Sequence, residues 1–152
     1  KGGGGDAYLK QLLNLSTSVK DQVKFLGFVG NDMELAKHYA QAKLFVYPSL
    51  AKFGESFGAA PLEASFFGCP MIVSNLPCFK EFFQPGKNGL EFDPDNGNAL
   101  GEMKKTLSVA LKNHEFLHTL GSNARKIADD FSLSKIGEDY LLDFAKVING
   151  RL

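Results

Sequence analysis

The 152-residue chain has no tryptophan, only two cysteines and no excess of either charge. So few cysteines exclude the disulfide-dense scaffolds of small secreted proteins. Seventeen basic side chains balance seventeen acidic ones, so net charge does not draw the chain to nucleic acid or to an anionic membrane. No signal peptide and no long apolar segment are recognisable in these residues, and the expectation is therefore a cytoplasmic protein.

What the chain does contain is typical of one globular domain with a sizeable core. Hydrophobic residues make up 44% of it and charged residues 22%. The central stretch predicts a βαβ unit, in which short β-rich runs at Leu44–Tyr47 and Met71–Ser74 flank a helical pattern from Gly58 to Phe67. The two strands of such a unit are parallel, and ligands bind beyond their carboxyl ends, which here means the loop 49–57 and the start of the helix.

Two glutamates lie in this unit, Glu55 in the loop and Glu63 in the helix, with seven residues between them. The helical neighbours of Glu63, three and four positions away, are all apolar, so its carboxylate must reach a polar partner or solvent at the helix end. A ligand hydroxyl is one such partner, and a glutamate at a helix rim is the alternative. Glu55 alone indicates no more than a solvated loop residue.

The helix start between the two glutamates predicts an anion site. Gly58 follows Phe57 where the loop enters the helix, and a glycine there lets a ligand approach the backbone closely. The free amides of Gly58, Ala59 and Ala60, together with the helix dipole, suit a phosphate. A phosphate site flanked by two carboxylates fits a ligand with sugars on both sides of the phosphate, which describes a nucleotide-sugar.

These motifs resemble the donor-binding half of the retaining GT-B glycosyltransferases with an E-x7-E motif, the glycosyl transferases group 1 family. The resemblance covers nearly the whole chain and is carried by Gly27-Phe28-Val29, Pro48-Ser49, Glu55-Ser56-Phe57-Gly58, Pro61-Leu62-Glu63-Ala64, Gly68-Cys69-Pro70, Ile72-Val73-Ser74-Asn75, Glu81, Asn88-Gly89-Leu90, Phe92 and Phe131-Ser132.

The resemblance implies a Rossmann-like parallel sheet with helices on both faces and a donor-binding domain over residues 1–152. It assigns Glu55 to the hydroxyls of the donor sugar near the reacting carbon and Glu63 to the ribose. The remaining donor-binding positions that it implies are Phe57, Gly58, Ala59, Leu62, Gly27, Phe28 and Val29, the last three lying against the base. It implies no metal and no cofactor, since the nucleotide-sugar is a substrate.

The same resemblance implies that parts of the enzyme are missing here: the first β-α unit of the donor domain, the basic residues that pair with the diphosphate, and the domain that binds the acceptor glycan or lipid-linked sugar. The expectation is that this chain alone binds donor weakly and does not catalyse, and that any peripheral association with the membrane belongs to the missing half. Two alternatives stay open, a non-catalytic nucleotide-sugar binding or regulatory module and a GT-B epimerase or phosphorylase.

Further elements are expected on either side of the central unit. A helix capped by Asp6 runs to about Leu15 with Tyr8, Leu9, Leu12 and Leu13 turned inward, and Val23–Val29 is predicted as a buried strand. Asn31 caps a helix to about Ala42 that carries His38 on its outer side. After the unit come a short helix 77–83, a strand 90–92, and helices at about 98–112, 114–120, 122–130 and from Ser132 or Ser134 to Ile148. The apolar stripe of the last helix is Ile136, Tyr140, Leu141, Phe144 and Val147.

A competing motif is His114-Glu115-Phe116-Leu117-His118, which matches the HExxH pattern of zinc proteases, with Glu138 as a conceivable third ligand. His114 falls at a helix end after Lys112-Asn113, so solvated histidines are the favoured interpretation. Burial without a disulfide is expected for Cys69 and Cys78, and a helix start near Cys78 suggests a lowered thiol pKa.

Overall fold

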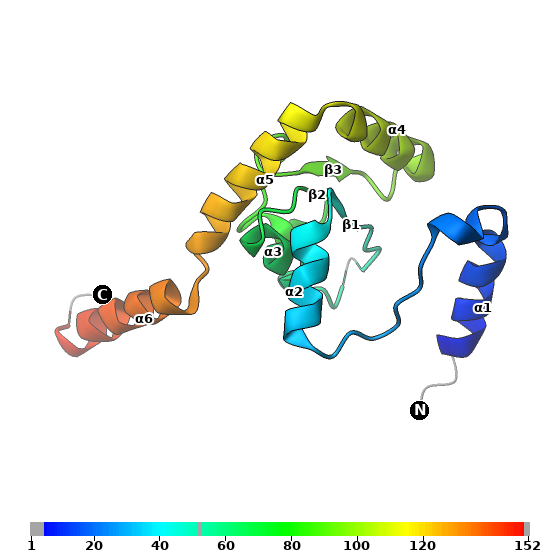
Figure 1. The fold of residues 1–152 in the computed structure, drawn as a ribbon. Coiled ribbons are helices and arrows are strands. Elements are labelled where there is room, and N and C mark those ends of the chain that lie inside the picture. Colours follow the sequence, from blue (N-terminus) through cyan, green and yellow to red (C-terminus); the bar gives the residue numbers. More distant parts are fainter. Residues whose placement is uncertain (1–4, 52, 151–152) are drawn as a thin grey trace. The chain divides into compact units, whose positions relative to one another are not determined.

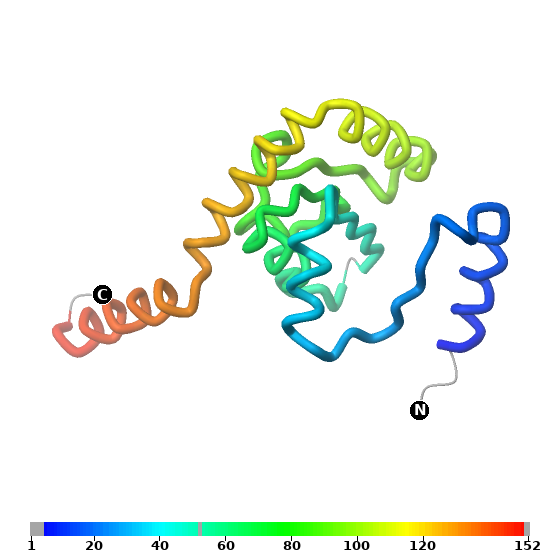
Figure 2. The backbone as a smooth tube through the Cα atoms, in the orientation of Figure 1, coloured from blue at the N-terminus to red at the C-terminus, as the bar shows by residue number. Residues whose placement is uncertain are grey.

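The computed structural model describes residues 5–51 and 53–150. The chain divides into two units, Lys1–Asp32 and Met33–Leu152, which are described separately. The first contains α1 (Gly5–Leu15), a 3-10 helix η1 (Thr17–Gln22) and an extended stretch up to residue 31 (Figure 2). The elements of the second are α2 (Asp32–Gln41), β1 (Phe45–Tyr47), α3 (Ala59–Phe66), β2 (Met71–Ser74), the 3-10 helix η2 (Pro77–Phe79), β3 (Leu90–Phe92), α4 (Ala99–Lys112), α5 (His114–Asp129) and α6 (Leu133–Ile148).

The sheet is parallel, as predicted. Its three strands lie in the order β1-β2-β3, with Val46 paired to Ile72 and Val73 to Glu91 (Figure 1). The helix α3 connects β1 to β2, so the predicted βαβ unit is confirmed. The helix is one residue shorter at each end than predicted, β1 begins one residue later, and β2 has the predicted bounds. Parallel strands need such crossover connections, which place helices on the faces of the sheet.

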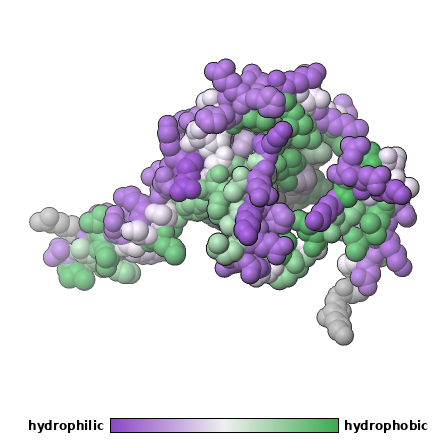
Figure 3. Space-filling view, viewed as in Figure 1, coloured by the Kyte–Doolittle hydropathy of each residue, from purple (hydrophilic) through white to green (hydrophobic). Residues whose placement is uncertain are grey.

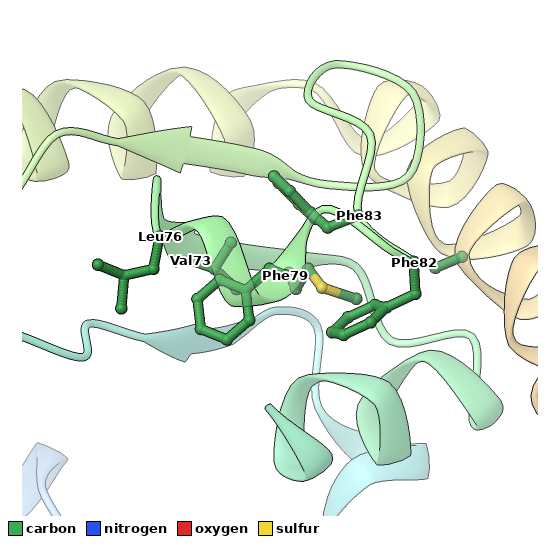
Figure 4. Close-up of a cluster of buried hydrophobic side chains, with 7 residues drawn as sticks. Val73, Leu76, Phe79, Phe82 and Phe83 are labelled. Carbon is green, nitrogen blue, oxygen red and sulfur yellow. The ribbon is translucent and has the colours of Figure 1, made fainter. Parts of the chain in front are cut away.

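The central strand β2 is buried on both faces because its side chains alternate between two cores. Met71 and Val73 point into a cluster with the side chains of Leu76, Phe79, Phe82, Phe83 and Ala124 (Figure 4). Ile72 faces the opposite way, into a cluster with Phe92, Ala110 and Leu117 from β3, α4 and α5. This continuous burial explains why Met71–Ser74 lacks the polar alternation of a half-exposed strand.

The prediction of two helices at 114–120 and 122–130 is wrong, because α5 is continuous from His114 to Asp129. The gap between the two predicted helices falls at Gly121, which is buried inside α5. A Cβ on Gly121 would lie 2.2 Å from the carbonyl oxygen of Gly68, at the end of α3. The glycine therefore allows α3 and α5 to pack at close range, rather than ending a helix.

The strand predicted at Val23–Val29 is not formed. The stretch is extended but hydrogen-bonded to no strand among the described residues, and Phe25 and Leu26 are exposed. Its hydrophobic pattern fits a strand, but a strand needs a neighbour to supply the ladder.

Two apolar helix faces are largely exposed, and for the first of them burial was expected. Tyr8, Leu9 and Leu13 of α1 stand in solvent, and Gly5 rather than Asp6 begins that helix. Ser132 caps α6 as predicted, but its stripe is not buried either. Figure 3 shows hydrophobic side chains gathered over α6. The amphipathic patterns of both helices are real, but within each unit no described element covers them.

The short helix predicted at 77–83 is a single 3-10 turn, η2, followed by turns up to Phe83. Its purpose in the fold is packing, since Phe79, Phe82 and Phe83 are all buried in the core of Figure 4.

Candidate functional site

The loop after β1 lies at the carboxyl edge of the sheet, where the βαβ pattern places a ligand site. The hydroxyl of Ser74, the last residue of β2, donates to the carbonyl oxygen of Ser49 at 2.7 Å. This bond joins the ends of two neighbouring strands and anchors the start of the loop that carries Glu55.

Glu55 is held by two hydroxyl groups from the end of β1. The Tyr47 hydroxyl donates to its carboxylate at 3.0 Å from Oε2, and the Ser49 hydroxyl lies 3.1 Å from the same oxygen. The side chain is half-buried. A carboxylate held by two donors has a defined orientation and still has lone pairs for ligand hydroxyls.

The start of α3 is built around Gly58. This residue has φ +83°, the left-handed region that favours glycine, and serves as N-cap of the helix. A Cβ there would also lie 2.4 Å from Cε1 of Phe79. Both facts require glycine at this position. As at any helix start, the first amides of α3 have no intrahelical acceptors.

Glu63 projects from the second turn of α3 and is exposed to solvent. The Tyr39 hydroxyl of α2 donates to its Oε2 at 3.1 Å. The ring of Tyr39 is itself fixed, stacked on Phe67 and edge-on to Phe45 at centroid distances of 5.8 and 5.6 Å. Glu63 was expected to reach a polar partner or solvent, and it has both, a tyrosine hydroxyl and exposure to water.

The two tyrosines show how the carboxylates affect their surroundings. Desolvation, followed by the charge and hydrogen bond of Glu63, raises the pKa of Tyr39 to about 12. Desolvation and the hydrogen bond to Glu55 likewise raise the pKa of Tyr47. Both tyrosines therefore remain neutral donors at physiological pH, so each glutamate keeps a fixed hydrogen bond.

Two other predicted donor-site residues place their side chains against the core. Phe57 packs its ring against Phe82 and Phe131, at centroid distances of 5.3 and 5.8 Å, and Leu62 packs against the same core. Ala59 is exposed at the start of α3. That the backbone amides of this segment face a ligand stays a prediction.

The predicted base-binding loop is described within its own unit. Gly27, Phe28 and Val29 belong to the first unit, which is described separately. Gly27 adopts φ +68° and Phe28 is 96% exposed. The contact of these residues with the base remains a prediction.

Sequence reasoning missed Tyr39 and Tyr47, the residues that orient the two glutamates. Tyr47 could have been found from the sequence, because it is the last residue of the predicted strand, just before the loop that carries Glu55. Tyr39 had a weaker one, since the sequence distance of 24 residues to Glu63 hides the contact.

The HExxH residues behave as predicted from their position. His114 is the first residue of α5, after the capping Asn113, and both His114 and His118 are exposed. Among the described residues, no three His, Cys, Asp or Glu side chains are grouped so that they could share a metal ion. His38 is on the surface as expected, 4.0 Å from Glu34 one turn before it.

Both cysteines are free, and Cys69 is buried while Cys78 is half-buried. The suggested low pKa of Cys78 is wrong: desolvation and then the charge of Glu55 raise it. Burial raises the pKa of Cys69 to about 11. Neither thiol is prepared for nucleophilic work.

Comparison with known proteins identifies the class. The family model of glycosyl transferases group 1 matches residues 1–127, and the chain therefore belongs to this family. Its fold is that of the C-terminal part of GT-B enzymes, an α/β domain with a parallel sheet.

Particular relatives agree with the family. The O-antigen chain mannosyltransferase RfbU of Salmonella typhimurium is 36% identical over 107 residues, which are 70% of this chain and 27% of that protein. The uncharacterized glycosyltransferase MJ1607 of Methanocaldococcus jannaschii is 31% identical over 140 residues, 90% of this chain and 34% of that protein. The chain thus spans about a third or less of the length of these relatives.

Solved structures share the fold. Anabaena HepE in complex with UDP and glucose superposes with a TM-score of 0.79 at 24% identity, over 94% of this chain and 38% of that one. The C-terminal domain of the group 1 protein LpcC from Francisella tularensis gives a TM-score of 0.64 at 20% identity, over 82% of this chain and 60% of that one. In the part of the chain that the structure describes, no helix has the length and apolar character to cross a membrane.

Proposed function

We propose that this chain binds the nucleotide-sugar donor of a glycosyltransferase at the carboxyl edge of its sheet. The observation that carries the proposal is the placement of two carboxylates around a helix start opened by a left-handed glycine, with each carboxylate oriented by a tyrosine. The relative HepE was solved with UDP and with UDP-glucose, which supports a diphosphate nucleotide as the ligand.

Each part of the site suits one part of such a ligand. Glu63 accepts hydrogen bonds from the ribose hydroxyls, and the first amides of α3 with the helix dipole bind the diphosphate. Glu55 accepts hydrogen bonds from the sugar hydroxyls and so sets the position of the anomeric carbon. This arrangement requires no metal ion from the chain, since amides and dipole supply the partial positive charge.

In the whole protein, the reaction is the transfer of the sugar to an acceptor hydroxyl with retention. The bond between the anomeric carbon and the diphosphate oxygen breaks, a bond to the acceptor oxygen forms on the same face, and the acceptor proton goes to the departing diphosphate. Negative charge grows on that leaving group, so amides already directed at it lower the barrier.

Calorimetric titration with UDP, GDP, ADP and their sugars tests the binding roles. We expect Glu63→Gln to weaken every nucleotide by about 10- to 100-fold, the size of a lost hydrogen bond to a charged group. Glu55→Gln should remove only the additional affinity of the sugar. Glu138→Gln, at an exposed carboxylate on α6, is the matched control.

Two outcomes contradict the assignment. Nucleotide binding that is insensitive to Glu63→Gln removes the ribose role, and equal losses for UDP and UDP-sugar in Glu55→Gln remove the sugar role. A protein carrying this chain that binds donor but transfers no sugar would be the binding module instead of the enzyme.

A further inference from the structure

A hollow lies at the opposite edge of the sheet from the proposed donor site. It has a volume of about 600 Å³ and is lined by Lys43, Gly68, Pro70, His114, Leu117, His118, Ser122, Arg125 and Lys126. Lys43 comes before β1 and Pro70 before β2, so the hollow opens at the amino ends of these strands. The loop that carries Glu55 follows the carboxyl end of β1, and the two sites are distinct.

The wall of this hollow is one face of α5. His114, His118, Ser122 and Lys126 follow one another at spacings of four residues, and residues spaced so share a side of a helix. Leu117 and Pro70 supply buried apolar surface at the base. Lys43 faces α5 from the loop, so cationic groups converge from two segments distant in sequence.

The charge of the hollow is of one sign. Of the described residues that line it, three are lysine or arginine, two are histidine and none carries a carboxylate. Arg125 is paired on its own helix with Asp129, whose Oδ1 lies 3.4 Å from its Nε. Arg125 also donates to the carbonyl oxygen of Phe66 at the end of α3, which fixes the guanidinium at the rim. In a chain with no net charge, this concentration of cations is a local property of the hollow.

The cations of the hollow also explain why the HExxH pattern here is not a metal site. The two histidines do lie one turn apart on the same face, as a zinc site would need, but their neighbours in the hollow are Lys43, Arg125 and Lys126. Cations at these positions repel a metal ion and attract an anion.

We propose that this hollow binds a phosphate-bearing anion, either a soluble phosphorylated molecule or the headgroup of an anionic lipid. Lysine and arginine supply the charge, and Ser122 and the imidazoles supply hydrogen-bond donors. The site is independent of the donor site, and each can be tested without the other.

The test is a titration of the isotope-labelled chain with inorganic pyrophosphate, followed by amide NMR, which locates binding. We expect saturable shifts at Lys43, His118 and Ser122. The double variant Lys43→Ala/Lys126→Ala should weaken them about 25-fold, from about fivefold for each basic side chain lost near an anionic group. Both lysines are exposed, so their removal leaves the fold intact, which circular dichroism checks.

The matched control is Lys105→Ala. Lys105 lines a smaller hollow, of about 320 Å³, in which Glu91 and Glu102 offset its charge. This variant should bind pyrophosphate as the unchanged chain does.

Vesicles separate the two sources of the anion. Binding to phosphatidylglycerol vesicles but not to phosphatidylcholine vesicles, lost in the double variant, identifies a lipid headgroup. Saturable pyrophosphate shifts without vesicle binding identify a soluble ligand. The proposal is overturned if pyrophosphate shifts are absent, are confined to residues 58–60, or persist in the double variant.

Discussion

Replacing Gly121 by alanine tests the close packing of α3 on α5. On helix propensity alone the change would stabilise the chain by about 1 kcal/mol, because glycine is unfavourable in a helix interior. Against this, the new Cβ would lie 2.2 Å from the carbonyl oxygen of Gly68 and 3.3 Å from Cδ of Pro70. Backbone atoms cannot turn aside as a side chain can, so the two helices must separate.

Overpacking of this kind costs about 1–3 kcal/mol, and more where the backbone must move. A Cβ 2.2 Å from a backbone oxygen belongs in the upper part of this range, at about 2–3 kcal/mol. After the propensity gain of about 1 kcal/mol is subtracted, we expect Gly121→Ala to lower the free energy of unfolding by about 1–2 kcal/mol. For a chain of this size each kcal/mol shifts Tm by about 2–4 °C. Thermal denaturation followed by circular dichroism should therefore show a decrease in Tm of about 2–8 °C.

The matched control is Gly137→Ala in α6, where a Cβ would meet nothing within 4 Å. The propensity gain acts there alone, so this variant should have an equal or higher Tm than the parent chain. A Gly121→Ala chain that is as stable as the parent, or more so, would refute the inference that glycine is required by the helix contact.

Three further predictions follow from the site and the core. The Tyr39 pKa is raised from 10.0 to about 12, so its contribution to stability is complete below pH 10 and is lost as pH rises toward 12. Ultraviolet titration should show a tyrosine step near pH 12 that is absent in Tyr39→Phe. A Tyr39→Phe chain with the same titration curve as the parent chain would contradict the contact with Glu63. Gly58→Ala should lower Tm and weaken nucleotide binding, because φ +83° strains alanine by about 1–2 kcal/mol and its Cβ meets Phe79; an unaltered Tm would show that the helix start does not need glycine. Cys69 is buried and has a pKa of about 11, so it should be alkylated at neutral pH far more slowly than model thiols. Timed labelling followed by mass spectrometry checks this, and fast labelling at Cys69 in the native chain would exclude its burial.

Predictions that depend on contacts between sequence neighbours were mostly correct, and those that depend on contacts between distant residues were mostly wrong. Helix ends set by neighbouring residues were predictable, as Ser132 at the start of α6 and Asn113 before α5 show. Gly121 misled the prediction because its role depends on Gly68, a residue 53 positions earlier that touches it only in the folded chain (121 − 68 = 53). The predicted strand at Val23–Val29 failed for a related reason: hydrophobicity is local, but a ladder needs a second strand.

The sequence by itself determined the parallel βαβ unit, the glycine at the start of α3 and the two glutamates of the proposed donor site, since these depend on periodicity and spacing over some thirty neighbouring residues. Only the tertiary structure decided which groups orient those glutamates and which cations surround His114 and His118. Tyr39 and Glu63 lie on different helices, and Lys43 meets α5 from a loop more than 70 residues earlier. Such contacts are fixed by how the helices pack on the sheet, and no spacing within one segment encodes them.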